Sequence, residues 1–260
     1  MNVGVSTANL YPMYTEEALE QLLKAGFQYI EIFINTESEA EPEFAGELRR
    51  RADVYGARIL SVHSYNAISE AFLYFSNYQR RFEDGVKHLK KLFETACILG
   101  ASYVIIHGDR PYSPLSDEDS IRRFERLYDL GKKYGIILLQ ENVFNYRSGN
   151  LAYLSNMRRL LGEKAQFVLD LKQCKRCGIH PSDVISAMAG GIRHVHVSDS
   201  DDLHDCLVPG RGKTDYGELL SQLKKNGFEG DLIMELYRNN FNDITDLDQG
   251  CKILKKMITL

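Results

Sequence analysis

A short unit recurs along the chain: a glycine, then a run of apolar, mostly β-branched or aromatic residues, then a polar residue. Clear copies begin at Gly26, Gly56, Gly100, Gly135, Gly191 and Gly230, and a looser copy follows Gly162. Each glycine follows a segment with helical periodicity, where it can adopt the left-handed conformation that ends a helix. The runs after the glycines are almost wholly apolar, which is typical of parallel strands covered on both faces.

Amphipathic segments of helical length separate these runs. They comprise residues 15–25, 43–55, 78–99, 116–134, 151–161 and 214–226, and Pro181 suits the first turn of a small helix before Gly191. With a further strand at residues 3–7, the count is eight strands and eight helices in strict alternation. Such alternation predicts parallel strands with right-handed crossovers, and a (β/α)8 barrel takes about 250 residues. We therefore predict an α/β fold in which residues 1–260 form a single TIM-barrel domain.

A doubly wound open sheet is the structural alternative, and it would place a glycine-rich phosphate loop after the first strand. Residues 7–12 are Thr-Ala-Asn-Leu-Tyr-Pro, which is no such loop. The length also allows two average domains, but no linker rich in Pro, Gly or Ser divides the chain. The single barrel is the better prediction.

Composition limits the class of protein without indicating its chemistry. The 32 Lys and Arg residues against 36 Asp and Glu give a formal charge of −4, which disfavours a dedicated nucleic-acid-binding protein. No apolar run approaches the roughly 18 residues of a membrane span, and the first residues resemble no signal peptide. We expect a cytoplasmic protein, and composition leaves open whether it forms a homo-oligomer.

The five cysteines are scattered and odd in number, which is typical of reduced thiols. Cys174 and Cys177 form a CxxC pair. This pair lacks the context of a redox motif and the second pair of a structural zinc site. We therefore interpret both residues as incidental thiols.

Seven of the eight predicted strands end in a side chain that can bind a metal or carry a proton: Glu31, His63, His107, Glu141, Asp170, His196 and Glu235. Because the carboxyl ends of the strands meet at one mouth of a barrel, we expect these side chains to converge. The last four are three carboxylates and one imidazole, a set that suits one divalent ion: Mn²⁺, Mg²⁺, Co²⁺ or Zn²⁺. The alternative is that some of these acids pair with Arg147, Lys172 or Arg238.

The order of several short motifs resembles the xylose isomerase-like barrel superfamily. The motifs are His107-Gly, Gln140-Glu-Asn142, Leu169-Asp170, His194-Val-His-Val-Ser-Asp199, Pro209-Gly-Arg-Gly212 and Met234-Glu235. This superfamily includes sugar and sugar-phosphate isomerases and epimerases, inosose isomerases and dehydratases, 3-dehydroshikimate dehydratases and endonuclease IV. The resemblance implies that Glu141, Asp170, His196 and Glu235 are the metal ligands. It also implies that His63 and His107 line the substrate pocket.

The chain departs from the family pattern after the sixth strand. Many members carry a histidine three residues after the aspartate, where this chain has Gln173. In endonuclease IV that histidine and an Asp-x-His pair help to hold a trinuclear zinc cluster, and the corresponding stretch here is His204-Asp-Cys206. The cluster would be incomplete, so a DNA-repair nuclease is the weaker expectation. His63 and His107 match two of its ligands, which leaves a second metal open.

A divalent ion flanked by two glutamates suits removal of a proton from a carbon next to a carbonyl. We predict that Glu141 and Glu235 are the catalytic residues, one removing the proton and the other returning it. The expected activity is that of an isomerase or epimerase of a small sugar, sugar phosphate or related polyol ketone, acting through an enediolate. A dehydratase on the same site is the alternative, and a non-catalytic sugar-binding barrel is a further one.

Further substrate contacts are expected from Gln173, Arg211, Lys213 and Arg238, with Tyr11 and Phe33 as candidate pocket walls. Barrels often bind phosphate near the loops after strands 7 and 8, so Arg211 and Lys213 could hold a phosphate or carboxylate of the substrate. The structural alternative for their loop is a turn that leads into a helix, with Asp215 and Glu218 as a capping box.

Overall fold

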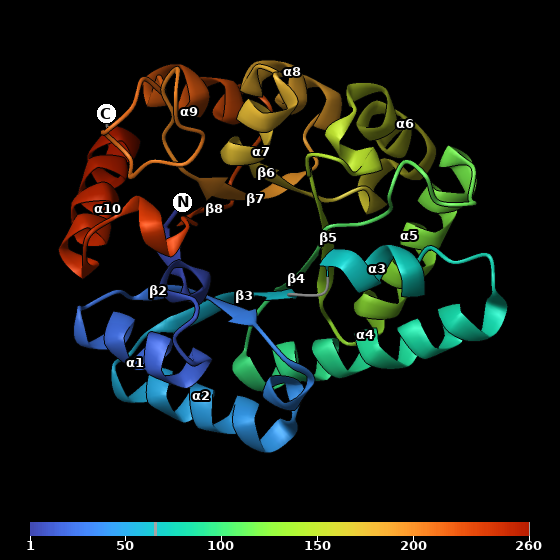
Figure 1. The fold of residues 1–260 in the computed structure, drawn as a ribbon, viewed down its shortest axis with the longest axis horizontal. Coiled ribbons are helices and arrows are strands. Elements are labelled where there is room, and N and C mark those ends of the chain that lie inside the picture. The colour runs from blue at the N-terminus through green and yellow to red at the C-terminus, as the bar shows by residue number, and fades with distance from the viewer. Residues whose placement is uncertain (65–66, 260) are drawn as a thin grey trace.

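Eight parallel strands close into a barrel in the order of the chain (Figure 1). They are β1 (Val3–Ser6), β2 (Tyr29–Ile34), β3 (Arg58–Ser64), β4 (Tyr103–Ile106), β5 (Ile137–Glu141), β6 (Phe167–Asp170), β7 (Ile192–Val197) and β8 (Asp231–Met234). This computed structural model describes residues 1–64 and 67–259. Pairing of Val3 with Leu232 and of Val5 with Met234 joins the first strand to the last. The predicted (β/α)8 barrel is confirmed.

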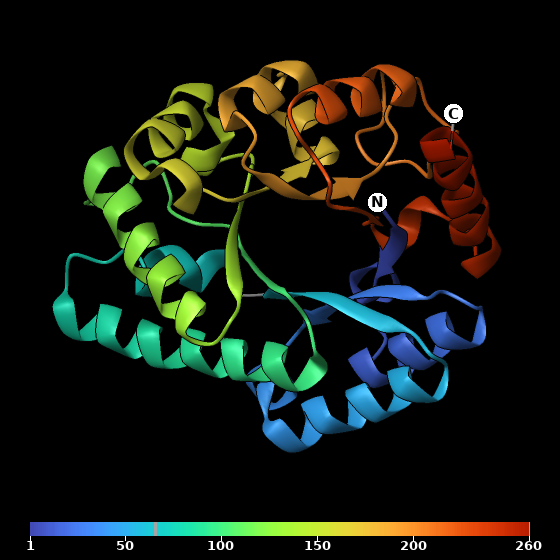
Figure 2. The same cartoon turned by 180° about the vertical axis from the view of Figure 1, so that it is seen from behind.

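Helices surround the barrel on all sides (Figures 1 and 2). They are α1 (Thr15–Lys24), α2 (Pro42–Val54), α3 (Ala67–Leu73), α4 (Gln79–Leu99), α5 (Asp117–Lys133), α6 (Leu151–Leu161), α7 (Leu171–Cys177), α8 (Pro181–Met188), α9 (Tyr216–Lys225) and α10 (Ile244–Thr259). The six helices predicted with explicit ranges agree with these bounds to within two residues. Among the described residues, no helix is long and apolar enough to cross a membrane.

Two short helices, α3 and α7, add to the predicted eight. Each has seven residues, too few for a periodic pattern to be recognised. The sequence predicted one small helix between β6 and β7, but Gly178 takes a positive φ of 66° and ends α7, and Pro181 then begins α8. Both additional helices begin near the carboxyl ends of strands, so they bring side chains to the mouth of the barrel.

The barrel interior has an apolar layer, and polar side chains lie nearer the carboxyl ends of the strands. Ile105, Leu139 and Val168 form a small buried cluster that is separate from the main core between strands and helices. Because alternate residues of a strand face the same side, the inward positions nearer the carboxyl ends of these strands include Glu141 and Asp170. This parity therefore places Glu141 and Asp170 at the mouth of the barrel, next to the apolar layer.

Two of the recurring glycines have a different role from the predicted one. Gly26, Gly56, Gly100, Gly135 and Gly162 do take positive φ values. Near the last two strands, however, positive φ belongs to Gly190 and Gly227 rather than to Gly191 and Gly230. A Cβ at Gly191 or Gly230 would instead collide with a backbone carbonyl. These two glycines are therefore required by close backbone approach.

Gly230→Ala should destabilise the fold more than Gly227→Ala. The added Cβ at Gly230 would meet the backbone of Arg193 and the ring of Phe228, whereas Gly227 has open space around it. We expect a loss of about 3 kcal/mol at Gly230 from overpacking. At Gly227 the loss should be about 1 kcal/mol, from the left-handed backbone alone. Urea unfolding of both variants measures the difference, and equal losses would contradict this explanation.

Candidate metal centre

The structure brings the four predicted ligands together at the mouth of the barrel. Glu141 and Asp170 end β5 and β6, His196 is the penultimate residue of β7, and Glu235 directly follows β8. All four side chains are buried. Each offers one nitrogen or oxygen atom such that the four atoms lie within 4.8 Å of one another. Residues from four different strands therefore form one compact donor group.

The two ring nitrogens of His196 face different carboxylates. Its Nδ1 lies 3.0 Å from Glu141, 3.5 Å from Glu235 and 3.8 Å from Asp170. Its Nε2 lies 3.2 Å from Glu31 Oε2. A metal-binding histidine commonly donates its other ring N–H to a carboxylate, which fixes its tautomer and orientation. The geometry of His196 therefore fits a ligand that binds through Nδ1 and is held in place by Glu31.

Glu31 lies deeper than the sequence predicted, because β2 continues past it to Ile34. Its Oε2 accepts hydrogen bonds from Ser61 Oγ at 2.7 Å and from His194 Nε2 at 3.1 Å, in addition to that from His196. Burial raises the pKa of Glu31, but the neighbouring histidines more than offset this effect and hold the pKa well below its ordinary value. Glu31 is therefore an ionised acceptor of hydrogen bonds, and it lies deeper in the barrel than the four proposed ligands.

His63 lies between the two predicted catalytic glutamates. Its Nδ1 is 3.3 Å from Glu235 Oε1 and its Nε2 is 3.9 Å from Glu141 Oε2. Burial lowers the pKa of His63, but Glu235, Glu31 and Glu141 outweigh it and raise this pKa to about 10. Neither ring nitrogen makes a hydrogen bond of normal geometry within the described part of the chain. His63 can therefore contact a ligand that enters from the mouth.

Sequence reasoning missed Glu70, which lies on α3 and is fully buried. Its Oε2 accepts the backbone N–H groups of His107 and Gly108, at 2.7 and 2.9 Å, and its Oε1 lies 3.2 Å from His107 Nδ1. These contacts fix the His107 ring, whose Nε2 lies 3.8 Å from Glu141 Oε2. No periodic or motif signal marks Glu70, because its helix is a short insertion between β3 and α4.

The charges of this group fit a bound cation. The carboxylates of Glu31, Glu141, Asp170 and Glu235 are buried together, and the Lys172 ammonium lies against only two of them. Asp170 Oδ2 is buried without a hydrogen bond of normal geometry in the described chain. Burial opposes protonation of His196, but Glu235 and Glu31 raise its pKa well above the ordinary value. Carboxylate and imidazole donors are those that Mn²⁺, Mg²⁺, Co²⁺ and Zn²⁺ accept.

A cavity of about 420 Å³ opens onto the donor group. It is lined by Ala8, Tyr11, Phe33, Asn35, His63, His107, Glu141, Lys172, Gln173, Glu235, Leu236 and Tyr237. This lining includes three residues predicted to contact the substrate, His63, His107 and Gln173. It also includes the two predicted wall residues, Tyr11 and Phe33. Lys172 and Tyr237 were not predicted to line it. The volume lies within the range of small-molecule sites.

Three of the expected substrate contacts do not line this cavity. Arg211 pairs with Asp246, and Lys213 is exposed and pairs with Asp202. Arg238 donates to the backbone carbonyls at positions 241 and 242. The backbone of the Arg211 loop is shaped by Asp199, whose carboxylate accepts N–H groups from positions 210, 212 and 214. The structural alternative, a turn leading into α9, explains this loop.

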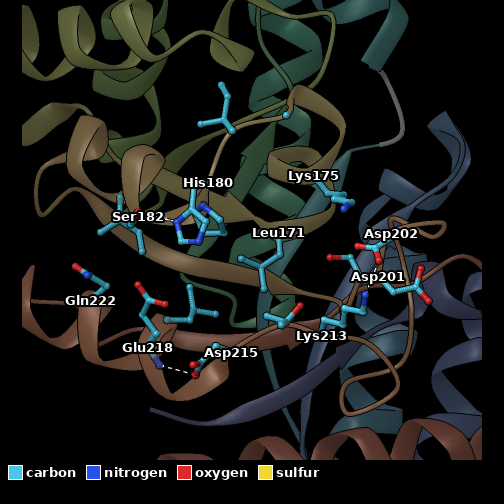
Figure 3. Close-up of a pocket in the computed structure, with 17 residues that line it drawn as sticks. Leu171, Lys175, His180, Ser182, Asp201, Asp202, Lys213, Asp215, Glu218 and Gln222 are labelled. Atoms are coloured by element: carbon cyan, nitrogen blue, oxygen red, sulfur yellow. Dashed lines mark hydrogen bonds and ion pairs between the residues drawn. The ribbon is translucent and has the colours of Figure 1, made fainter.

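A larger cavity of about 600 Å³ lies between α7, α8 and α9 (Figure 3), and none of the four donor residues lines it. Its polar side chains serve local structure: Lys213 pairs with Asp202, Asp215 caps α9, and His180 caps α8. Among the described residues, no buried polar atom without a partner lines it. The barrel mouth is therefore the candidate functional site.

The cysteines take no part in the donor group. All five are free, and Cys174 and Cys177 lie on α7. Burial raises the pKa of the Cys174 thiol far above its ordinary value, which makes it unreactive. The interpretation of these residues as incidental thiols agrees with this environment.

Glu31→Gln should weaken metal binding by about 10- to 100-fold, because the His196 N–H loses its charged acceptor. The matched control is Glu39→Gln, a change at another buried glutamate, which bonds to Thr15 and to the backbone of Asn35. Calorimetric titration of the metal-free proteins with Mn²⁺ gives the Kd values. An unchanged Kd in Glu31→Gln would contradict the positioning role.

Mn²⁺ affinity should increase with pH. The neighbouring carboxylates raise the pKa of His63 and of His196, so both rings are protonated in the metal-free protein at neutral pH. A proton on His196 occupies the lone pair that a metal needs, and binding must release it. Kd should therefore fall from about pH 6 to about pH 8, with proton release measurable by calorimetry in buffers of different ionisation enthalpy. A Kd that does not depend on pH would refute this.

Comparison with known sequences gives two kinds of match. A family model described as Xylose isomerase-like TIM barrel matches residues 19–257. An uncharacterized protein of Mycobacterium leprae (strain TN) is 24% identical over 275 residues, which cover 95% of this chain and 92% of the relative. An inosose isomerase of Halalkalibacterium halodurans is 24% identical over 273 residues, which cover 93% and 92%.

Solved structures show the same barrel. A D-tagatose 3-epimerase-like protein superposes with a TM-score of 0.82 at 21% identity, over 100% of this chain and 97% of that chain. A D-psicose 3-epimerase, in a crystal structure determined in the presence of D-fructose, gives a TM-score of 0.77 at 14% identity with the same coverage. The resemblance found in the sequence motifs is confirmed, and this protein belongs to the xylose isomerase-like TIM barrel family.

Proposed function

We propose that this protein is a divalent-metal-dependent epimerase or isomerase of a small sugar or related polyol ketone. The observation that carries this proposal is the pair of glutamates, Glu141 and Glu235, which belong to one buried donor group and also line the cavity above it. The sugar epimerases among the structural neighbours and the inosose isomerase relative support the same class of substrate.

Glu141 and Glu235 are the proposed proton carriers. They come from β5 and β8 and lie on either side of the His63 ring, so they can approach a bound carbon from different directions. Burial raises the pKa of Glu235, but Lys172, His196 and His63 outweigh it and keep the pKa well below its ordinary value. Glu235 is therefore ionised, which is the state that a proton acceptor requires. One glutamate removes the proton next to the carbonyl and the other returns it, which gives epimerisation.

Glu141, Asp170, His196 and Glu235 are the residues that would hold a divalent ion. When bound, the ion would polarise the substrate carbonyl and stabilise negative charge on the adjacent oxygens. His107, fixed by Glu70, points a ring nitrogen toward Glu141 and can bond a hydroxyl. Gln173 accepts the backbone N–H of Phe144 through Oε1 at 3.0 Å, so its amide N–H groups can donate to the substrate.

The walls of the cavity suit a sugar without a phosphate group. Tyr11, Phe33 and Tyr237 line it, and aromatic rings can cover the apolar C–H faces of a sugar. The predicted anion-binding residues Arg211 and Lys213 are engaged with Asp246 and Asp202. We therefore favour a neutral ketose or inosose over a sugar phosphate as the substrate.

Glu141→Gln and Glu235→Gln should each lower the rate of epimerisation by at least about 100-fold, because each removes one proton carrier. The assay incubates the Mn²⁺-loaded proteins with ketohexoses and inosose in D₂O and follows deuterium at the carbon next to the carbonyl. Each variant should still exchange the proton of the one epimer that faces its remaining glutamate. Glu43→Gln, an exposed change on α2, is the control and should match the wild type.

Metal content separates loss of the base from loss of the ion in these variants. A variant that has lost its Mn²⁺ reports on ligation, and one that retains Mn²⁺ reports on proton transfer. Near-normal epimerisation by either loaded variant on a substrate that the wild type converts would refute the two-base proposal. Release of water from the substrate, seen as an absorbing enone, would instead identify a dehydratase.

A further inference from the structure

Lys172 places an ammonium group inside the donor group, and the proposed function uses it only to keep Glu235 ionised. Its Nζ lies 2.8 Å from Glu235 Oε2 and 3.2 Å from Asp170 Oδ2. These two carboxylates are half of the proposed ligand set. The Lys172 side chain is 5% exposed, so its charge is only weakly screened by bulk water.

The start of α7 brings Lys172 to this position. Asp170 ends β6 and is also the N-cap of α7, with Oδ1 accepting the backbone N–H of Gln173 at 2.9 Å. The helix therefore begins directly at the strand end, and Lys172 lies in its first turn, against the other oxygen of Asp170. Both oxygens of this proposed ligand are thus in contact with groups from α7 while the ammonium stays in place.

In the same position the ammonium also lies near an aromatic ring of the cavity wall. The Lys172 Nζ lies 5.0 Å from the centre of the Tyr237 ring, and Tyr237 lines the cavity and is 45% exposed. The face of a tyrosine ring attracts a cation. A flexible lysine side chain that turned away from Asp170 and Glu235 could move toward this ring, which it already approaches.

We propose that Lys172 is a built-in competitor of the divalent ion, and that its ammonium must leave the Asp170 and Glu235 carboxylates for the ion to bind. This inference rests on the metal site of the proposed function. The ammonium and the ion carry charges of the same sign, so they repel each other at such short range. The positive charge of Lys172 therefore lowers the affinity of the site for the ion, and it also holds the carboxylates together when the ion is absent.

The test compares the Mn²⁺ affinity of metal-free wild type with that of two variants, Lys172→Met and Lys172→Gln. Methionine keeps much of the length of the side chain without the charge, and glutamine keeps a neutral hydrogen-bond donor. Lys175→Met, an exposed change on the same helix, is the matched control. Calorimetry should show binding at least about tenfold tighter in both Lys172 variants, with an unchanged Kd in the control.

The outcomes separate this inference from the proposed function. An equal or weaker Mn²⁺ affinity in folded Lys172 variants would overturn the inference, while Mn²⁺ binding by the wild type would leave the metal site standing. An absence of Mn²⁺ binding in all four proteins would overturn both.

Folding of the variants gives a second measurement. If a Lys172 variant folds only when Mn²⁺ is present, the result supports the inference, because ion and ammonium then replace one another. A variant that fails to fold both with and without Mn²⁺ would overturn it, because the ion then could not take the place of the lysine.

Discussion

Four buried carboxylates share the polar interior of this barrel, and the arrangement around them follows from the cost of burying like charges. Glu31, Glu141, Asp170 and Glu235 are each at most 7% exposed. Protons on His63 and His196 and the ammonium of Lys172 provide the compensating positive charge in the metal-free chain. A divalent ion would take over part of this compensation. The four acids can therefore stay ionised only where cations lie beside them.

The barrel strands arrange the acids and histidines of this site in two layers. Strand parity directs Glu141, Asp170 and His196 into the mouth, and it directs Glu31 and His194 below them, where they contact each other at 3.1 Å. The strand ends are also tied together. Asn142, at the end of β5, donates to the backbone carbonyl of Asp170 and accepts its backbone N–H, at 3.1 and 2.7 Å. Such bonds hold the proposed ligands in place, which would reduce the cost of organising them around an ion.

Sequence patterns predicted the barrel and most of the helix bounds because these depend on local periodicity and on helix-ending glycines. The same patterns located the residues that line the mouth, since the carboxyl ends of barrel strands always converge. They placed Arg211 and Lys213 near the substrate by analogy with phosphate sites, but Asp246 and Asp202 engage these cations. Ion pairs between distant loops have no local pattern, so the sequence could not indicate them.

The sequence by itself determined which strands form, which of their residues face inward, and hence that acids and imidazoles gather at one end. Only the tertiary structure decided which of these groups contact one another. Glu31 and His194 are 163 positions apart, and they meet only because the barrel closes. Glu70 reaches His107 from a seven-residue helix, and Lys172 reaches Glu235 across the mouth. Periodicity fixes the direction of a side chain from its own strand or helix, whereas its partner depends on the closed arrangement of all eight strands.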